Sequence, residues 1–288
     1  MPLSSEIVGL SGEPVIHTID ARWTMAYAAG IGDTNPLYMD TRARPDVLAH
    51  PMFPVCYEWP LFLNARYLPA TEHLNAEERL RGVHATHDLV LHRPVRAGMS
   101  VRTTATVVAV EARRPGAYQL TRLDTGELDG EPISTTWYGT LMRGVLVVGG
   151  NRALPDLPES PAGATGPADE IEIPVSANAA HVYTECARIW NPIHTDTAVA
   201  DAAGLPEIIL HGTASIALAV SKVIDRVLAG RADSVTRIAA RLGAMVPMPS
   251  TLTLRILSSG ARATAFEVLN DKGEPAVRNG LIEYRRVS

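Results

Sequence analysis

The chain of 288 residues is long enough for two domains or one large one, and its 46% hydrophobic and 20% charged residues are typical of a soluble globular protein. A net charge of −5 without any basic run argues against a nucleic-acid partner. No uninterrupted apolar stretch approaches about 18 residues, so we expect no membrane-spanning helix. The first residues lack the basic and apolar regions of a signal peptide, and Cys56 and Cys186 have no metal-like spacing. We therefore expect a cytoplasmic protein with reduced thiols.

The first half of the chain carries a short motif, Tyr27–Asp40, then a helical stretch, then runs rich in β-forming residues. These runs are residues 84–95, 100–112, 117–124 and 133–144. A segment with four prolines follows them at residues 149–170, and such a composition interrupts both helices and strands. It predicts a linker at 151–169 between an N-terminal domain, 1–150, and a C-terminal domain, 170–288.

The second half begins with a short helix from Tyr183 to about Arg188, followed by an NPIH turn in which Pro192 resists helix before it. A second short helix ends at Gly204. The sequence HGTASIALAVSKVIDRVLAG, residues 211–230, predicts a long helix that is buried on most sides, because its first turns carry few polar residues. Four β-rich runs end the chain, at residues 234–246, 251–259, 263–270 and 276–287.

The two halves resemble each other. YAAGIGDTNPLYMD, from Tyr27, aligns without gaps on YTECARIWNPIHTD, from Tyr183, and RPDVLAHP, from Arg44, aligns on LPEIILHG, from Leu205. Two matches in the same order are hard to obtain by chance, so we interpret the chain as a duplicated domain. Each half then has one buried helix followed by an antiparallel sheet that can wrap it, which is an α+β layout.

These segments resemble the MaoC-like, or (R)-specific enoyl-CoA hydratase (hydratase 2), family. Its pattern is approximately Y-x-x-x-S-G-D-x-N-P-x-H, followed by a G-x-x-x-x-I-x-H-G segment. The resemblance covers most of the chain, although the specific motifs span only about 25 residues in each half. It implies two tandem hot-dog domains, each an antiparallel sheet wrapped around a long central helix.

The resemblance also implies a reaction, namely the hydration of 2-enoyl thioesters or the dehydration of (R)-3-hydroxyacyl thioesters. The acyl group is carried by coenzyme A or acyl carrier protein, and this hydro-lyase chemistry needs no metal and no redox cofactor. In the family an Asp and a His move the protons, and such groups contribute about 10²–10⁴-fold. The amide that follows the His of the HG segment stabilises the oxyanion, because the N–H groups at a helix N-terminus are free and its dipole favours negative charge.

The second copy of the motif keeps most of this machinery. By resemblance His194 matches the family His, Asn191 the Asn that orients the loop, and Gly212 the oxyanion Gly. However, Ile189 stands at the position of the Asp, and it cannot move a proton.

The first copy has lost more of the machinery. Asp33 matches the family Asp and Asn35 the Asn, but Tyr38 stands at the His position. Pro51, which has no amide hydrogen, stands at the position of the oxyanion Gly.

Several replacements for the missing Asp are open. His194 could act alone, taking a proton from water and returning it to Cα. Glu185, four residues before Ile189, could share its helix face and replace the Asp. Asp33 could reach across from the first copy, although sites related by two-fold symmetry in hot-dog proteins normally lie well apart. The last alternative is that no hydratase catalysis occurs.

Simpler interpretations stand beside these. His194 by default is a polar loop residue near a helix cap, and Asp196 is most simply an N-cap. His211 is expected to shape the turn into the long helix rather than perform chemistry. In the cluster HATHDLVLH, His84 and His87 should point to opposite faces of a strand, which argues against a shared metal ion.

Two rival functions follow from the same residues. The loss of the Asp at Ile189 favours a catalytically silent acyl-thioester binder or a partner subunit. A hot-dog thioesterase is a further alternative, because the fold supports several chemistries. We expect an acyl-CoA or acyl-carrier-protein substrate, no nucleic-acid or membrane partner, and possible pairing of two-domain chains as a homodimer.

Overall fold

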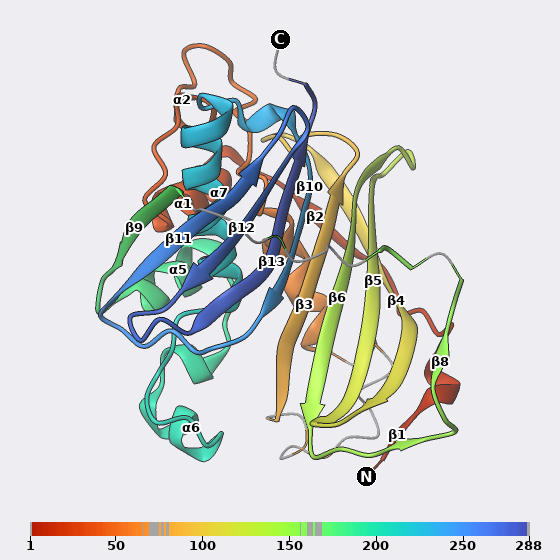
Figure 1. Ribbon diagram of the computed structural model, residues 1–288. Coiled ribbons are helices and arrows are strands. Elements are labelled where there is room, and N and C mark those ends of the chain that lie inside the picture. Colours follow the sequence, from red (N-terminus) through yellow and green to blue (C-terminus); the bar gives the residue numbers. More distant parts are fainter. Residues whose placement is uncertain are drawn as a thin grey trace. The chain divides into compact units, whose positions relative to one another are not determined.

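A computed structural model describes residues 2–64, 66–68, 75, 78, 81–155, 157–159, 164 and 169–286 (Figure 1). The chain divides into two compact units, and each unit combines segments that are distant in sequence. Unit 1 consists of Met1–His17, Tyr57–His92 and Ser100–Ser160, and unit 2 consists of Thr18–Cys56, Arg93–Met99 and Pro161–Ser288. The segment Thr18–Cys56 therefore folds with the second half of the chain. The domains predicted from the sequence, 1–150 and 170–288, placed this segment in the first half instead.

Unit 1 is built on an antiparallel sheet with the strand order β2-β4-β5-β6-β3. Its strands are β2 (Val15–Thr18), β3 (Gly82–Leu91), β4 (Ser100–Arg113), β5 (Gly116–Glu127) and β6 (Pro132–Arg143). Two short pairs flank the sheet: β1 (Leu3–Ser4) runs parallel to β7 (Val147–Val148), and β8 (Arg152–Ala153) pairs with β4. The predicted β-rich runs of the first half are thus confirmed as strands.

The first half lacks the long helix that the second half has, within the residues that the structure describes. After the first HG-like segment come the five-residue helix α3 (Pro54–Glu58) and the 3-10 helix η2 (Trp59–Phe62), and η1 (Ser5–Ile7) is also short. Pro60 has no N–H for a helical hydrogen bond, and its ring clashes with the preceding turn, so α3 cannot continue through it. The expectation of a long central helix in both halves is therefore not met in the first.

Unit 2 contains five strands that pair antiparallel in the order β10-β13-β12-β11-β9. The strands are β9 (Asp169–Val175), β10 (Val235–Leu242), β11 (Ser250–Ser259), β12 (Ala263–Leu269) and β13 (Pro275–Tyr284). Helix α7 (Gly212–Leu228) packs against β11, β12 and β13 (Figure 1), and most of its side chains are buried. The predicted buried helix and the four β-rich runs after it are confirmed.

The remaining helices of unit 2 carry the two copies of the repeated motif. The first copy lies on α1 (Ala21–Gly30) and α2 (Pro36–Met39), and the second on α5 (Ala179–Ala187) and η4 (Pro192–His194). Asp196, the last residue of the second copy, is the N-cap of α6 (Thr197–Ala202). A further 3-10 helix, η5 (Ala232–Ser234), follows α7. No described helix is both long and apolar enough to cross a membrane.

The two motif copies meet where α1 packs on α5. The rings of Tyr27 and Tyr183, which are equivalent in the repeat, have centroids 5.8 Å apart. At Gly30 a Cβ atom would come within 2.7 Å of the Cβ of Cys186, so only glycine allows this approach of the helices. The duplication that the sequence indicates is thus visible as a helix pair within one unit.

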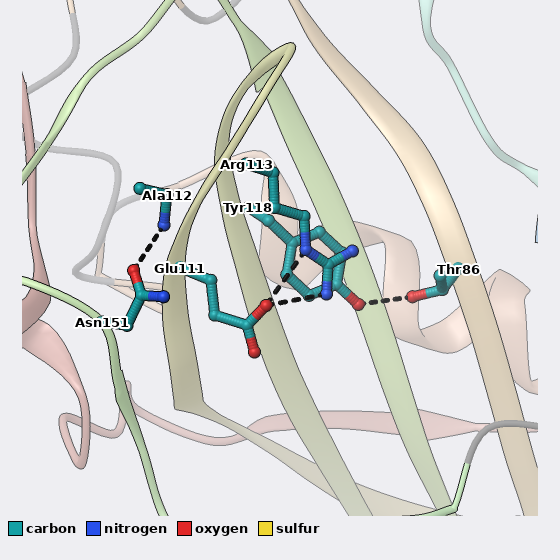
Figure 2. A network of polar contacts seen from close by, with 6 residues as sticks. All are labelled: Thr86, Glu111, Ala112, Arg113, Tyr118 and Asn151. Carbon is teal, nitrogen blue, oxygen red and sulfur yellow. Dashed lines mark hydrogen bonds and ion pairs between the residues drawn. The ribbon is translucent and has the colours of Figure 1, made fainter.

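A polar network covers part of the sheet of unit 1 and involves Tyr118 on β5 (Figure 2). The guanidinium of Arg113 lies 3.3 Å from the centre of the Tyr118 ring, and it is held there by an ion pair of 2.9 Å with Glu111. The Tyr118 hydroxyl is 2.7 Å from the Thr86 hydroxyl on β3, and Gly139 between them has no side chain to obstruct the bond.

The predicted linker begins as an ordered extension of this sheet. The backbone N–H of Ala112 donates a hydrogen bond of 2.8 Å to the side-chain oxygen of Asn151, and β8 follows directly (Figure 2). Leu154 and Leu157 then pack on the apolar cluster that includes Tyr118. The later linker prolines, Pro161 and Pro167, lie outside the described residues.

Unit 1 contains a carboxyl group, that of Glu58, that is buried away from solvent. Glu58 is 2% exposed and accepts a hydrogen bond of 2.6 Å from the Thr136 hydroxyl. Burial raises the pKa of this carboxyl to about 8, because the charged form is poorly solvated there, and the Thr136 bond offsets only part of that effect.

Replacing Glu58 with Gln removes the ionisation and keeps an oxygen acceptor for Thr136. Because the pKa of about 8 in the folded state lies above the usual 4.5, the folded state binds more protons than the unfolded state between those values. We expect the free energy of unfolding of the wild type, relative to E58Q, to fall as the pH rises from about 5 to about 8 and to level off above that. Urea denaturation across this range measures it, and a difference that is independent of pH would contradict the assignment.

Candidate functional site

His194 is the last residue of η4, directly after the turn that the repeat predicts. Helix α5 ends at Arg188, which takes the left-handed conformation with φ 57°, and Pro192 begins η4. The Nδ1 atom of His194 lies 2.8 Å from the backbone oxygen of Ile209. Because a carbonyl oxygen only accepts, Nδ1 carries the hydrogen, and Nε2 is left with its lone pair.

The ring of His194 stacks on that of His211, with centroids 3.7 Å apart and planes 26° from parallel. His211 is the N-cap residue of α7, and its Nε2 lies 3.2 Å from the hydroxyl oxygen of Thr184 on α5. Burial in this position lowers the pKa of His194 to about 4, and only the Ile209 carbonyl acts in the other direction. His194 is therefore a neutral base near pH 7.

Gly212 is the first residue of α7, next to this pair of rings. The first amides of a helix have no acceptor within the helix, and the positive end of the helix dipole lies there. A Cβ atom at Gly212 would lie 2.5 Å from Cδ1 of Leu242, so a larger residue there requires the Leu242 side chain to move. The start of α7 thus offers hydrogen-bond donors beside a neutral imidazole.

Glu185 and Asn191 lie together in a pocket of about 230 Å³ beside these residues. Its described lining does not include His194 or Gly212, but Thr184 in its wall contacts His211, which in turn stacks on His194. The side chains that line it are His181, Thr184, Glu185, Trp190, Asn191, Pro192 and Thr195.

Ile189 is only 5% exposed, and it brings no proton-transfer group to the position of the family Asp. Glu185 has an exposed side chain, and no hydrogen bond joins it to His194 in the described part of the chain. The structure therefore places the predicted replacement near the site without connecting it to the base.

Asp33 lies near the other end of α7. Its carboxylate accepts a hydrogen bond of 3.0 Å from the backbone N–H of Asn35, and the Asn35 side chain donates one of 2.7 Å to the backbone oxygen of Gly230. At about 1.5 Å per residue, α7 separates Gly212 from this end by roughly 25 Å. Asp33 does not reach His194, which rules out the third replacement considered from the sequence.

The other residues of the first copy pack against the middle of α7. Nδ1 of His50 accepts a hydrogen bond of 3.1 Å from the backbone N–H of Met52, so Nε2 carries the hydrogen and donates to Ser221 on α7 at 3.1 Å. Tyr38, at the position of His194, is fully buried, and its hydroxyl has no hydrogen-bond partner among the described residues. These side chains of the first copy are buried in contacts with their neighbours, which is the environment of residues that pack.

Models of known protein families match both halves of the chain. Residues 161–277 match the MaoC-like domain, and residues 6–136 match the FAS1-like dehydratase domain region. The candidate catalytic residues considered above, apart from Asp33, lie within the segment that matches the MaoC-like domain.

Individual relatives agree with the family matches. A 3-hydroxyacyl-thioester dehydratase of Mycobacterium tuberculosis is 25% identical over 99% of both chains. The crystal structure of a MaoC-like dehydratase from Phytophthora capsici superposes with a TM-score of 0.82 at 19% identity, covering 98% of each chain. A hypothetical M. tuberculosis protein described as a double hot dog superposes with a TM-score of 0.64 at 13% identity, covering 96% of this chain and 95% of the other. The predicted α+β class with tandem hot-dog domains is confirmed, except that the described part of the first half has no long helix, and a hydro-lyase is confirmed at the level of the family.

Reasoning from the sequence did not identify two contacts of the stacked histidines. Nδ1 of His194 donates to the backbone oxygen of Ile209, and any residue could provide that group. The Thr184 hydroxyl bonds to His211, and only its position directly after the repeated Tyr183 could have drawn attention to it.

One prediction about the histidines outside the MaoC-like domain was wrong. The pairing of β3 with β6 shifts register between His84 and Thr86, and this bulge turns His84 to the same face as His87. The two rings are 5.3 Å apart. Within the described residues no group of three or more His, Cys, Asp or Glu side chains is arranged to hold a metal ion.

We expect ¹⁵N NMR of the imidazoles to show His194 protonated on Nδ1 and unprotonated on Nε2 near pH 7, because of the Ile209 carbonyl. The ring should take up its second proton only near pH 4, because burial disfavours the cation. The spectrum of His194→Gln assigns the resonance, and the urea-unfolded protein gives the unperturbed titration. A midpoint between 6 and 7 in the folded protein, or the opposite tautomer, would contradict this description.

Proposed function

We propose that this protein hydrates 2-enoyl thioesters, or dehydrates (R)-3-hydroxyacyl thioesters, carried by coenzyme A or acyl carrier protein. The observation that carries the proposal is the neutral His194, fixed by Ile209 with Nε2 as the base and placed beside the first turn of α7. The family matches and the name of the thioester dehydratase that is related over the full length support it.

In the hydration direction, Nε2 of His194 removes a proton from water as the oxygen bonds to Cβ. The electron pair of the double bond moves towards the thioester, and the charge that develops on its oxygen is stabilised by the N–H of Gly212. A preorganised donor of this kind is worth about 10²–10³ in rate where it has been removed. The protonated His194 then returns its proton to Cα, so that one residue serves as base and acid, and Asn191 orients the loop that carries it.

The first test is the hydration of crotonyl-CoA and of longer enoyl-CoAs, followed by the loss of absorbance of the conjugated thioester. We expect the wild type to hydrate at least one of them and His194→Ala to lower kcat by about 10²–10⁴, because the general base is lost. His92→Ala, which removes an exposed histidine from unit 1, is the control and should leave kcat unchanged. Equal rates for wild type and His194→Ala would show that His194 is not the base.

A substitution at Glu185 distinguishes the mechanism in which His194 acts alone from one with two proton carriers. Because its side chain is exposed and makes no bond to His194, we expect Glu185→Gln to lower kcat by less than about tenfold. Glu207→Gln, a change of an exposed carboxyl on the loop before α7, is the matched control. A loss of about 10²–10⁴ with Glu185→Gln alone would instead make Glu185 the second proton carrier.

The buried Ile189 motivates one other function, that of a silent acyl-thioester binder or a partner subunit. Such a protein would bind acyl-CoA with measurable affinity while no enoyl-CoA of any chain length is turned over. Gain of hydration in Ile189→Asp would then identify the missing group. Release of free thiol from acyl-CoA would point to a thioesterase instead.

A further inference from the structure

The proposed reaction depends on two groups that belong to different elements of unit 2. His194 is the last residue of η4, and Gly212 is the first residue of α7. A base and an oxyanion donor act on the same substrate only if each keeps its position relative to the other, and a displacement of about 1 Å can cost about 10² in rate. Side chains that join the two elements are therefore candidates for a role in positioning.

The ring of His211 is the direct link between the two elements. His211 precedes Gly212 in the chain as the N-cap of α7, and its ring is stacked on that of His194 with centroids 3.7 Å apart. The His211 side chain is 3% exposed, so it is enclosed by other side chains. Whatever fixes the rotation of this ring also fixes the surface on which His194 rests.

The hydroxyl of Thr184 holds the His211 ring. Thr184 lies on α5, it is 4% exposed, and its Oγ1 is 3.2 Å from Nε2 of His211. A hydrogen bond to a ring nitrogen opposes rotation of the imidazole about its bond to Cβ. Because the pair is buried, water is poorly placed to replace the hydroxyl, and its removal leaves Nε2 without this partner.

The neighbouring residue of α5 makes a second bond to the start of α7. The hydroxyl of Tyr183 donates a hydrogen bond of 3.0 Å to Oγ1 of Thr213. Consecutive residues of α5 thus hold both neighbours of Gly212, since Thr184 bonds to His211 on one side and Tyr183 to Thr213 on the other. The glycine amide and the stacked rings are fixed by the same helix.

The first copy of the motif shows which of these two bonds is specific to the second. Tyr27, the equivalent of Tyr183, donates a hydrogen bond of 3.4 Å to the backbone oxygen of Met52, the equivalent of Thr213. The tyrosine bond therefore occurs in both copies and belongs to the fold.

The bond of Thr184 has no counterpart in the first copy. Ala28 stands at the equivalent position and has no hydroxyl. His50, the equivalent of His211, has its Nε2 on Ser221 of α7 instead. The bond to a helix α5 hydroxyl thus accompanies the copy that also has His194 and Gly212.

We propose that Thr184 is a positioning residue for the hydratase reaction. Its hydroxyl fixes the ring of His211 and, through the stacked rings, the position of His194 relative to the amide of Gly212. The inference rests on the proposed function, because Thr184 acts on the base through His211 and not on the reacting atoms.

Two substitutions of Thr184 test this role through kcat and KM for enoyl-CoA hydration. Thr184→Val keeps a similar shape without the hydroxyl, and we expect it to lower kcat by about ten- to 100-fold with KM within about threefold of the wild type. Thr184→Ser restores the hydroxyl and should bring kcat back to within about threefold of the wild type. Thr184→Ala takes the place of Thr184→Val if the valine variant does not fold.

Three outcomes of these kinetics would overturn the proposal. An unchanged kcat in Thr184→Val would show that the hydroxyl is not needed, and equal losses in Thr184→Val and Thr184→Ser would show that the methyl group is what matters. Thr184 also lines the pocket of about 230 Å³, so a raised KM at unchanged kcat would indicate a direct contact with substrate instead.

Thr24→Val is the matched control for the loss of a buried helical hydroxyl in unit 2. Thr24 lies on α1, is fully buried, and donates a hydrogen bond of 3.1 Å to the backbone oxygen of Ala21. We expect this variant to keep the kcat of the wild type, because no bond joins Thr24 to the stacked histidines. A loss as large as that of Thr184→Val would overturn the proposal, since it would show a general effect of removing a buried hydroxyl.

NMR without substrate separates this inference from the proposed function. In the wild type the stacked His211 ring should shift the ring protons of His194 upfield, and the spectrum of His194→Gln assigns them. Thr184→Val should move these resonances towards their unstacked positions, and Thr184→Ser should keep them in place. Unchanged His194 resonances in folded Thr184→Val would overturn the positioning role, whereas a wild type that hydrates no enoyl-CoA but shows the expected shifts would overturn the proposed function alone.

Discussion

The long buried helix α7 is the element on which unit 2 depends. Both copies of the repeated motif pack against it, but at different places: His194 and His211 at its start, Asn35 at Gly230 just beyond its end, and His50 against its middle. A helix has free amides and a positive dipole end only at its N-terminus. The free amides of α7 therefore lie beside the second copy and not beside the first.

This asymmetry accounts for what each copy has kept. The second copy retains the histidine and the glycine that use the start of α7. The first copy has Tyr38 and Pro51 at the equivalent positions, and its own helix, α3, has only five residues. Its remaining polar groups make structural bonds, as Asn35 does to Gly230. We therefore propose that the second copy carries the chemistry and that the first supports the helix.

Much of this could be predicted from the sequence, because periodicity and turn residues determine local structure. The long helix at 211–230, the β-rich runs and the repeat all have direct local signals. The bulge that turns His84, the grouping of Thr18–Cys56 with the second half and the distance from Asp33 to Gly212 depend on contacts between remote segments. In the candidate site, the residue types were readable, whereas the Ile209 carbonyl that fixes the tautomer of His194 was not, because every residue has such a group.

The central claim is that one motif copy does the chemistry and the other is a support. The most direct measurement is kcat for enoyl-CoA hydration by a double variant of the first copy, Asp33→Asn with Tyr38→Phe, which removes the ionisable groups at the positions of the family Asp and His while preserving size. The claim predicts a kcat within about threefold of the wild type, because neither side chain approaches His194. A loss of about 100-fold or more in a folded double variant would contradict it, since the first copy would then contribute to the reaction.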